Sequence, residues 1–299
     1  MNAPVENFHA VRRTGLGGSD MAAVLGLSPF KTALDVYLEK RGEVENWEGN
    51  SLTRAGQVME NVIAAMYAER MGVKLRRCNL TLRHPQADFL LGHIDRDIVG
   101  QRKGVEIKNV SPRIGYRWGK DGEPGAIAEY YLPQVHHYML VLDYPVFDVA
   151  AYFGGDDLRV YPIERDREWD DIIMDGASDF WRNHVIPGVP PPVDHDHPSA
   201  LGLLRRIYPC TDGTTVQADD SAYMWARVAR EASAKATEYT RIAEGAKAHL
   251  LDLMGTAAVL SFPQDGSRFV RKEVTRKAYT VESTSYMDAR FSTAKTKEQ

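Results

Sequence analysis

Two carboxylates and one ammonium group are expected to meet near the middle of this chain. Asp95 ends an apolar run, and Glu106-Ile107-Lys108 follows after a turn that contains glycine. Side chains alternate across a strand, so Glu106 and Lys108 share one face while Ile107 points into the core. Two carboxylates can hold a hard divalent cation, and a lysine can orient a water molecule beside it. This chemistry is typical of a metal-dependent nuclease, although a salt bridge across a hairpin would give the same pattern.

The metal ligands are predicted from these positions. We expect Asp95 and Glu106 to bind the cation, with the carbonyl of Ile107 as an additional ligand and Lys108 steering the attacking water. Asp97 is a second candidate, because it lies on the same face of the same predicted strand as Asp95. We favour Asp95, since it directly ends the apolar run.

Three other groups of polar residues have both a functional and an ordinary interpretation. Glu60 and Gln134, taken singly, are typical of exposed positions on predicted helices. Arg12, Arg13 and Ser19 surround a glycine-rich turn before a predicted helix. A helix N-terminus, a hydroxyl and an arginine can together bind an anion, and the alternative is that Ser19 only caps the helix.

Two further clusters are less informative. Asp194-His195-Asp196-His197 has the residue types of a metal site, but it lies in a proline-rich segment where nothing predicts a rigid geometry. Basic residues near the C-terminus could follow a phosphate backbone or form a solvated strand face. They are Arg268, Arg271, Lys272, Arg276 and Lys277.

The overall composition is that of an ordinary globular protein. The chain has 299 residues, of which 43% are hydrophobic and 26% charged, with a formal net charge of -4. No apolar stretch approaches membrane-spanning length and no signal-peptide pattern is present, so we expect a protein of a reducing cytoplasm. Cys78 and Cys210 are far apart, which argues against a structural zinc site. The net charge argues against coating nucleic acid by bulk attraction but allows a DNA enzyme with a basic channel.

Periodicity in the first part of the chain predicts an α/β core of helices and mixed strands. Ser19 is expected to cap a first helix, Thr32 a second, and Gly72 to end a third. The apolar face of the third helix is predicted as Val58, Val62, Ala65, Met66 and Tyr67. Helices are predicted over 20–25, from 32, and over 53–71, 133–142 and 169–184, and strands over 74–82, 89–99, 104–109, 147–153 and 158–163.

The last third of the chain has a different pattern. Residues 219–254 lack proline and repeat apolar residues in steps of four and three, which predicts a helix roughly 50 Å long that packs against a partner helix or another subunit. A hairpin of 257–262 and 268–279 is expected to follow. The predicted organisation is a core domain over 1–186, a proline-rich linker over 187–218 and a helical extension with a hairpin over 219–299.

Taken in order, these segments resemble the YqaJ-like viral recombinase family, which belongs to the PD-(D/E)xK nuclease superfamily and includes the phage lambda exonuclease. The resemblance covers about residues 8–185 and implies a restriction-endonuclease-like core, a mixed central β-sheet flanked by helices. It rests on four segments in the family's order: residues 12–20, 56–60, Asp95 with 106–108, and 131–139.

The resemblance also implies a role for each candidate residue. Asp95 and Glu106 would bind Mg²⁺, which Mn²⁺ can replace, in a centre of two ions. Glu60 would support a metal or its water, and Lys108 would position the nucleophilic water. Gln134 would keep the side chains of the site in fixed relative positions.

The resemblance also concerns the N-terminal segment, and the chain differs from the family at two positions beside Asp95. Arg12 and Ser19, with Arg13 beside them, would bind the 5′-phosphate of DNA. The family commonly has glycine after its catalytic aspartate and often a proline before it, whereas this chain has Arg96 and Ile94. The departures affect the expected strand geometry rather than the carboxylate.

The implied function is a phage-type, Mg²⁺-dependent 5′-to-3′ exonuclease in the cytoplasm of the bacterial host. It would resect linear double-stranded DNA for a single-strand annealing partner, and the resemblance also allows a homo-oligomer. The alternatives are an endonuclease or a nuclease of the Cas4 or RecB type, although two cysteines cannot form the four-cysteine cluster of an iron–sulfur version. From another class, the chain could be a catalytically silent DNA-end-binding or assembly protein, against which the intact set of Asp95, Glu106 and Lys108 argues.

Overall fold

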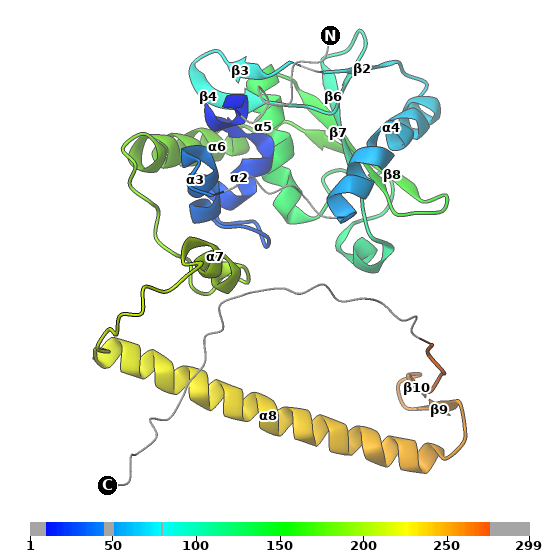
Figure 1. Ribbon diagram of the computed structural model, residues 1–299. Coiled ribbons are helices and arrows are strands. Elements are labelled where there is room, and N and C mark those ends of the chain that lie inside the picture. Colours follow the sequence, from blue (N-terminus) through cyan, green and yellow to red (C-terminus); the bar gives the residue numbers. More distant parts are fainter. Residues whose placement is uncertain (1–9, 45–50, 79, 276–299) are drawn as a thin grey trace. The chain divides into compact units, whose positions relative to one another are not determined.

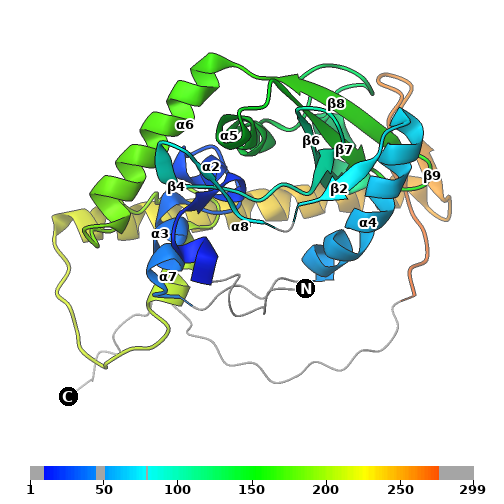
Figure 2. The ribbon, with the colours of Figure 1, turned by 90° about the horizontal axis from the view of Figure 1, so that it is seen from above.

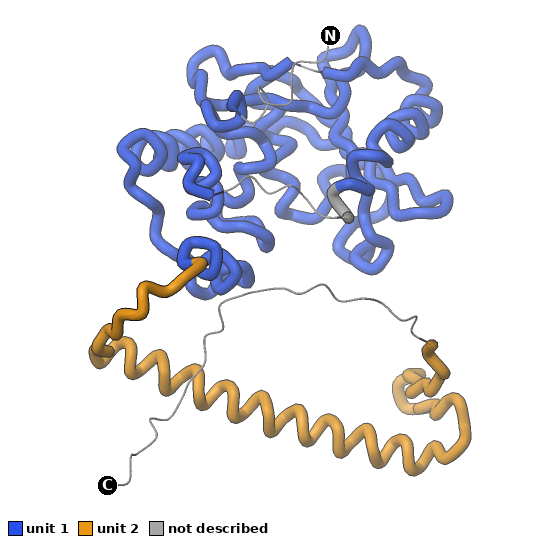
Figure 3. The backbone as a smooth tube through the Cα atoms, viewed as in Figure 1, with its two compact units in different colours: residues 1–208 blue, residues 209–299 orange. Residues whose placement is uncertain are grey.

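The computed structural model describes residues 10–44, 51–78 and 80–275, with the side chains of 51–53 excluded. The chain divides into two compact units, Met1–Tyr208 and Pro209–Gln299 (Figure 3). The candidate site residues all lie in the first unit, so its architecture is described first.

A mixed sheet forms the centre of the first unit. Within the described residues, five strands are arranged in the order β2-β5-β6-β7-β8, with β6 and β7 parallel and the other neighbours antiparallel. The parallel pair requires a crossover, and the helix α5 lies within it. The strands are β2 Leu75–Arg77, β5 Arg96–Ile98, β6 Lys103–Asn109, β7 Val146–Tyr152 and β8 Leu158–Glu164.

Helices α4 (Ser51–Met71) and α5 (Leu132–Leu142) cover opposite faces of this sheet (Figures 1 and 2). Ile63 of α4 belongs to one apolar cluster with Val105 and Ile107 of β6. On the other face, residues of α5 pack against alternate residues of β7, such as Val149. The alternation of β6 therefore turns Glu106 and Lys108 toward α5, as the sequence pattern predicts.

A smaller sheet of β1 (Leu16–Gly17), β4 (Ala87–Gly92) and β3 (Leu82–His84) lies in the same unit. The strand predicted over 89–99 is therefore two strands, β4 and β5, which belong to different sheets. The strand predicted over 74–82 likewise divides between β2 and β3. No proline marks either break, so the sequence pattern could not reveal them.

The remaining helices of the first unit surround a third apolar cluster, which includes Met21, Val36 and Ile173. Thr32 caps α3 as predicted, because its side chain accepts a hydrogen bond from the N–H of Asp35. The helices are α2 Gly18–Val24, α3 Ala33–Arg41, α6 Arg167–Phe180 and α7 Ala200–Ile207, with short helical turns η1 Pro112–Arg117, η2 Glu129–Tyr131 and η3 Trp181–Val185.

Two local predictions about helices were wrong. The N-cap of α2 is Gly17 rather than Ser19, which lies in the first turn. The predicted apolar face of α4 is right at Tyr67, which is fully buried, but wrong at Val58 and Val62, which are exposed, and it omitted the fully buried Ile63. Ala64 is buried and Ala65 exposed, so the true face is rotated by about one residue along the helix.

The segment predicted as a linker is partly structured. Helix α7 lies inside 187–218, and its Leu203 is buried in the apolar cluster of the first unit. The boundary between the two units falls between Tyr208 and Pro209. The prolines before α7 therefore lead into a packed helix, and only the part after it separates the units.

The second unit consists of the long helix α8 (Asp220–Met254) and a hairpin of β9 (Val259–Ser261) and β10 (Arg268–Val270). Asp219 caps the helix by accepting a hydrogen bond from the N–H of Ala222. Both elements were predicted, although Arg276 and Lys277 of the expected basic strand lie outside the described residues. In the described part of the chain, no helix is long and apolar enough to cross a membrane.

Candidate active site

Asp95 lies at a bend between β4 and β5, in the passage from the small sheet to the central one. Its Oδ2 accepts a hydrogen bond of 2.8 Å from the backbone N–H of Ile107 in β6. The bend therefore brings the carboxylate against the middle of the Glu106-Ile107-Lys108 segment. The structure thus joins the first two predicted metal ligands, Asp95 and Glu106, which are eleven positions apart along the chain and lie on neighbouring elements.

Glu106, Lys108 and Gln134 form a closed set of hydrogen bonds. The ammonium group of Lys108 donates to Oε1 of Glu106 over 2.6 Å and to Oε1 of Gln134 over 3.0 Å. The amide of Gln134 donates to the same Glu106 oxygen over 2.7 Å. Gln134 lies in the first turn of α5, where Pro133 fits because an N–H there has no partner within the helix. The predicted glutamine is therefore part of the site.

The charges of this group interact strongly. Burial raises the pKa of Asp95 to about 8, and the nearby negative charge of Glu106 contributes in the same direction. Burial by itself would lower the pKa of Lys108, but the Glu106 carboxylate outweighs it, so the pKa of this lysine is raised and it stays cationic. Its Nζ also lies 4.6 Å from the centre of the Tyr131 ring, a favourable cation–π distance.

The carboxylates have the properties of an ion-binding pair. Glu106 is only 3% exposed, and its Oε2 is buried without a hydrogen-bond partner. A buried carboxylate oxygen without a donor is costly, and a divalent cation would satisfy it. Burial and the charge of Glu106 raise the pKa of Asp95, and a cation bound between the two carboxylates would offset both effects. The residues present therefore fit a hard cation held between Asp95 and Glu106.

Asp97, the competing candidate, is directed elsewhere. It lies on β5, where it forms an ion pair with Arg76 and accepts a hydrogen bond of 2.9 Å from the hydroxyl of Tyr144. These contacts satisfy both of its oxygens away from Glu106. The structure therefore separates two aspartates that strand periodicity could not.

Glu60 lies near Asp95, whose pKa its negative charge helps to raise, but it is paired with Arg96. Its Oε1 accepts a hydrogen bond of 2.6 Å from the guanidinium of Arg96, which is buried on β5. Among the described residues, no three Asp, Glu, His or Cys side chains come close enough together to hold a metal ion jointly. Asp95 and Glu106 are therefore a pair, and Glu60 belongs to a neighbouring ion pair.

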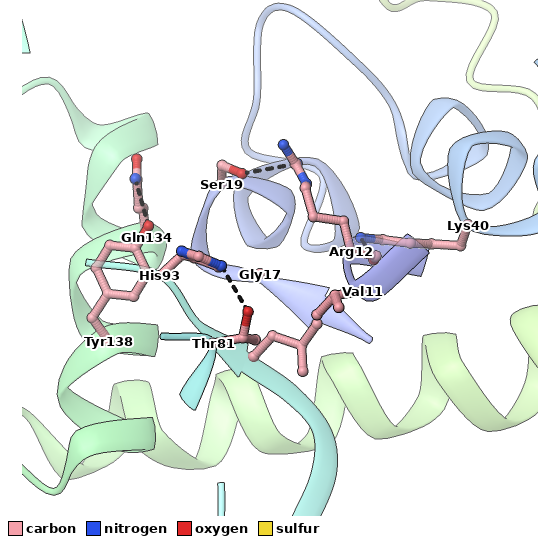
Figure 4. A pocket seen from close by; sticks show the side chains of 11 residues that line it. Val11, Arg12, Gly17, Ser19, Lys40, Thr81, His93, Gln134 and Tyr138 are labelled. Atoms are coloured by element: carbon pink, nitrogen blue, oxygen red, sulfur yellow. Dashed lines mark hydrogen bonds between the residues drawn. The ribbon is translucent and has the colours of Figure 1, made fainter. Parts of the chain in front are cut away.

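A pocket of about 230 Å³ adjoins this centre (Figure 4). Arg12, Ser19 and Lys40 line one part of it, and Gln134 and Tyr138 line another. The guanidinium of Arg12 lies 3.5 Å from the hydroxyl of Ser19. Because Gln134 also bonds to Glu106, the pocket and the carboxylate pair share a wall.

Arg13 is placed differently from its neighbour. It is absent from the residues that line the pocket, and its guanidinium lies against Gly42, at the end of α3. The three residues predicted to bind phosphate are therefore split, with Arg12 and Ser19 in the pocket and Arg13 outside it.

Residues 7–145 match the family model of the YqaJ-like viral recombinase domain. This segment is therefore similar to YqaJ-like viral recombinase domains. The resemblance inferred from the sequence is thereby confirmed.

Individual relatives extend this finding. The chain is 37% identical over 198 residues to the uncharacterized protein YqaJ of Bacillus subtilis (strain 168), covering 65% of this chain and 61% of that protein. The chain thus spans less than two thirds of that relative's length.

Solved structures show the fold. The alkaline exonuclease LHK-Exo of Laribacter hongkongensis, in its complex with dAMP, has a TM-score of 0.50 at 19% identity, over 60% of this chain and 92% of that one. The predicted α/β class, a restriction-endonuclease-like core with a mixed sheet between helices, is thereby confirmed.

Sequence reasoning missed a buried ionic network beneath the pocket. Asp20 is fully buried, and it accepts hydrogen bonds from Lys40 over 2.7 Å, from Lys31 over 3.2 Å and from the N–H of Gly17 over 3.0 Å. Burial alone would raise the pKa of Asp20, but the two lysines and Arg12 hold it well below its usual range. The network fixes the base of the pocket.

One signal in the sequence pointed to Lys40. It follows the buried Val36 by four positions and Tyr37 by three, so helical periodicity places it on the buried face of α3. A lysine on such a face requires a partner, and here the partners are Asp20 and the carbonyl of Arg12 at 2.9 Å. His93 and Thr81, which line the pocket and lie 2.8 Å apart, gave no comparable signal.

Proposed function

We propose that this YqaJ-like chain is a divalent-metal-dependent exodeoxyribonuclease that uses Mg²⁺, which Mn²⁺ can replace. The observation that carries the proposal is the buried pair of Asp95 and Glu106, with one oxygen lacking a donor and a lysine beside it. Such a pair suits a cation that activates water for attack on a phosphodiester. The family description of the matched domain, a viral recombinase, supports DNA as the substrate.

Asp95 and Glu106 would hold the ion, and the carbonyl of Ile107 is a further proposed ligand. When bound, the ion would supply Lewis-acid activation of a phosphoryl oxygen and of the attacking water. Asp95 must lose its proton to act as a ligand, and its hydrogen bond from Ile107 favours the ionised form.

Lys108 would orient the nucleophilic water. An ammonium group has three N–H donors, and two of them are directed at Glu106 and Gln134. The remaining donor can hold a water molecule at a fixed position relative to the carboxylate pair. Gln134 keeps both partners in register, because its amide group bonds to Glu106 and Lys108 at the same time.

The adjoining pocket would select DNA ends. Arg12 and Ser19 present a guanidinium and a hydroxyl, and both groups suit a terminal 5′-phosphate. A pocket that shares a wall with the carboxylate pair would place the end of a strand beside the centre. We therefore propose 5′-to-3′ digestion of one strand of linear double-stranded DNA.

The product would be a 3′ single-stranded overhang. We propose that a single-strand annealing protein takes it up during phage-type recombination in the cytoplasm of a bacterial host. The long helix α8 offers a surface for another copy of the chain or for this partner, since nearly all of its side chains are exposed.

Digestion of linear and covalently closed circular DNA tests the proposed function. The full chain should degrade the linear form in Mg²⁺, leave it intact in EDTA, and spare the closed circle under both conditions. Cutting of the closed circle would indicate an endonuclease instead. If neither form is degraded with Mg²⁺ or Mn²⁺, the proposal is wrong and a DNA-end-binding role is favoured.

A further inference from the structure

Arg96 is a buried cation next to the proposed metal centre. It is 5% exposed on β5, and its NH1 donates to Oε1 of Glu60 and to the carbonyl of Asp95, both over 2.6 Å. Its NH2 donates to the side chain of Asn61 over 2.7 Å. The guanidinium thus connects helix α4 to the bend that carries Asp95.

Glu60 and Arg96 lie on the α4 side of the sheet, although the Glu60 charge is close enough to Asp95 to contribute to its raised pKa. Arg96 is in register with Val105, and Val105 packs in the apolar cluster of α4. Neighbouring strands direct paired residues to the same face, so Arg96 and its partner lie on the α4 side. Glu106, one residue further along β6, is directed at Gln134 of α5.

Electrostatics also argues against Glu60 as a ligand of a second ion. A divalent cation at Glu60 would lie against the fixed positive charge of Arg96, 2.6 Å from the same carboxylate. If a cation took Glu60 from Arg96, the guanidinium would remain buried without its ionic partner. This is strongly unfavourable. No third ligand of the Asp, Glu, His or Cys type joins Asp95 and Glu106 in the described residues.

We propose that the centre takes a single divalent ion, held by Asp95 and Glu106, and that Arg96 is a positioning residue that prevents a second ion from binding at Glu60. This inference rests on the proposed function, and it replaces the expectation of two ions with Glu60 as a ligand. Arg96 also fixes the Asp95 bend through the carbonyl contact.

Calorimetric titration of the metal-free full chain with Mn²⁺ tests the proposal. The wild-type chain should bind one ion. Glu60→Gln should still bind one ion, with an affinity within about threefold of wild type, whereas loss of a true ligand or of its orienting partner costs about tenfold or more. Arg96→Met should bind two, because Glu60 is then free, and the double variant Arg96→Met/Glu60→Gln should return to one.

Two control variants distinguish the effect of the positive charge at Arg96 from an effect of substitution on folding. Arg96→Lys keeps a cation beside Glu60 and should bind one ion. Arg76→Met removes a guanidinium from the edge strand β2, where Arg76 pairs with Asp97, and should also bind one ion. Thermal melting of each variant shows whether it is folded, and the wild-type stoichiometry tests the proposal even if Arg96→Met does not fold.

The outcomes distinguish the inference from the proposed function. Two ions in the wild-type chain, or a tenfold loss of Mn²⁺ affinity in Glu60→Gln, would overturn the single-ion centre and leave the nuclease proposal standing. Failure of the folded wild-type chain to bind Mn²⁺ would overturn both. A stoichiometry of one in folded Arg96→Met would show that Arg96 does not exclude a second ion.

Discussion

The backbone N–H of Ile107 donates a hydrogen bond to Oδ2 of Asp95 over 2.8 Å. This bond ties the bend after β4 to the strand β6, and it places Asp95 beside Glu106 although the two residues come from different parts of the chain. A main-chain donor cannot rotate away as a side chain can, so the carboxylate position is fixed by the sheet itself.

Lys108→Ala should reduce the rate of DNA hydrolysis at least about a hundredfold, because the positioned donor beside the carboxylate pair is lost. The initial rate of nucleotide release from linear DNA in Mg²⁺ measures the effect. Lys120→Ala is a suitable control, since Lys120 is exposed and should leave the rate unchanged. Normal activity in a folded Lys108→Ala variant would remove the lysine from the mechanism.

Arg12→Ala should reduce the preference for 5′-phosphorylated over 5′-hydroxyl ends about tenfold or more, because a charge-assisted contact to phosphate is removed. The ratio of the two digestion rates is the measurement, and it does not depend on the fraction of active protein. Arg13→Ala offers a matched control, because its guanidinium lies outside the pocket, against Gly42. Equal effects of the two substitutions would contradict the assignment of the pocket.

The raised pKa of Asp95 predicts a specific pH dependence of stability in the metal-free protein. The carboxyl has a pKa near 3.8 in the unfolded chain and about 8 in the folded one, so the folded state binds the proton more tightly. Its contribution to stability is present at low pH and is lost as pH rises from about 4 to about 8. The melting temperature of the wild-type chain should therefore fall relative to that of Asp95→Asn over this range, and added Mn²⁺ should reverse the fall. A difference that stays constant with pH would contradict the predicted protonation.

Removal of the second unit should leave the nuclease active. The first unit contains the central sheet, the carboxylate pair and the pocket, and its boundary falls after Tyr208. A fragment of residues 1–208 is therefore expected to fold and to degrade linear DNA within about threefold of the full chain's rate. A folded fragment without activity would show that α8 or the hairpin contributes to catalysis or to DNA binding.

Local patterns predicted the elements that are defined by short-range sequence. Strand β6 alternates clearly, Pro133 marks the start of α5, and the absence of proline from 219–254 predicts α8. Glu106 and Lys108 could be placed on one face for the same reason. Each of these features depends on residues that are neighbours in the chain.

Features that depend on distant pairing could not be predicted in this way. The bend at Asp95 separates two sheets, but no proline marks it, and strand periodicity gives Asp97 the same face. The partnership of Glu60 with Arg96 joins residues 36 positions apart, and neither residue signals the other. Lys40 was an intermediate case, because its helical position indicated burial but not the identity of its partner, Asp20.

The most direct test of the active site compares Asp95→Asn with Asp97→Asn, two isosteric changes two residues apart. Initial rates of nucleotide release from linear double-stranded DNA in Mg²⁺ should fall at least about a hundredfold in Asp95→Asn, which loses an anionic ligand. Asp97→Asn should retain activity within about threefold, because Asp97 pairs with Arg76 and Tyr144 outside the centre. An active Asp95→Asn variant, or loss of activity in a folded Asp97→Asn variant alone, would contradict the assignment of Asp95 and Glu106 as the catalytic pair.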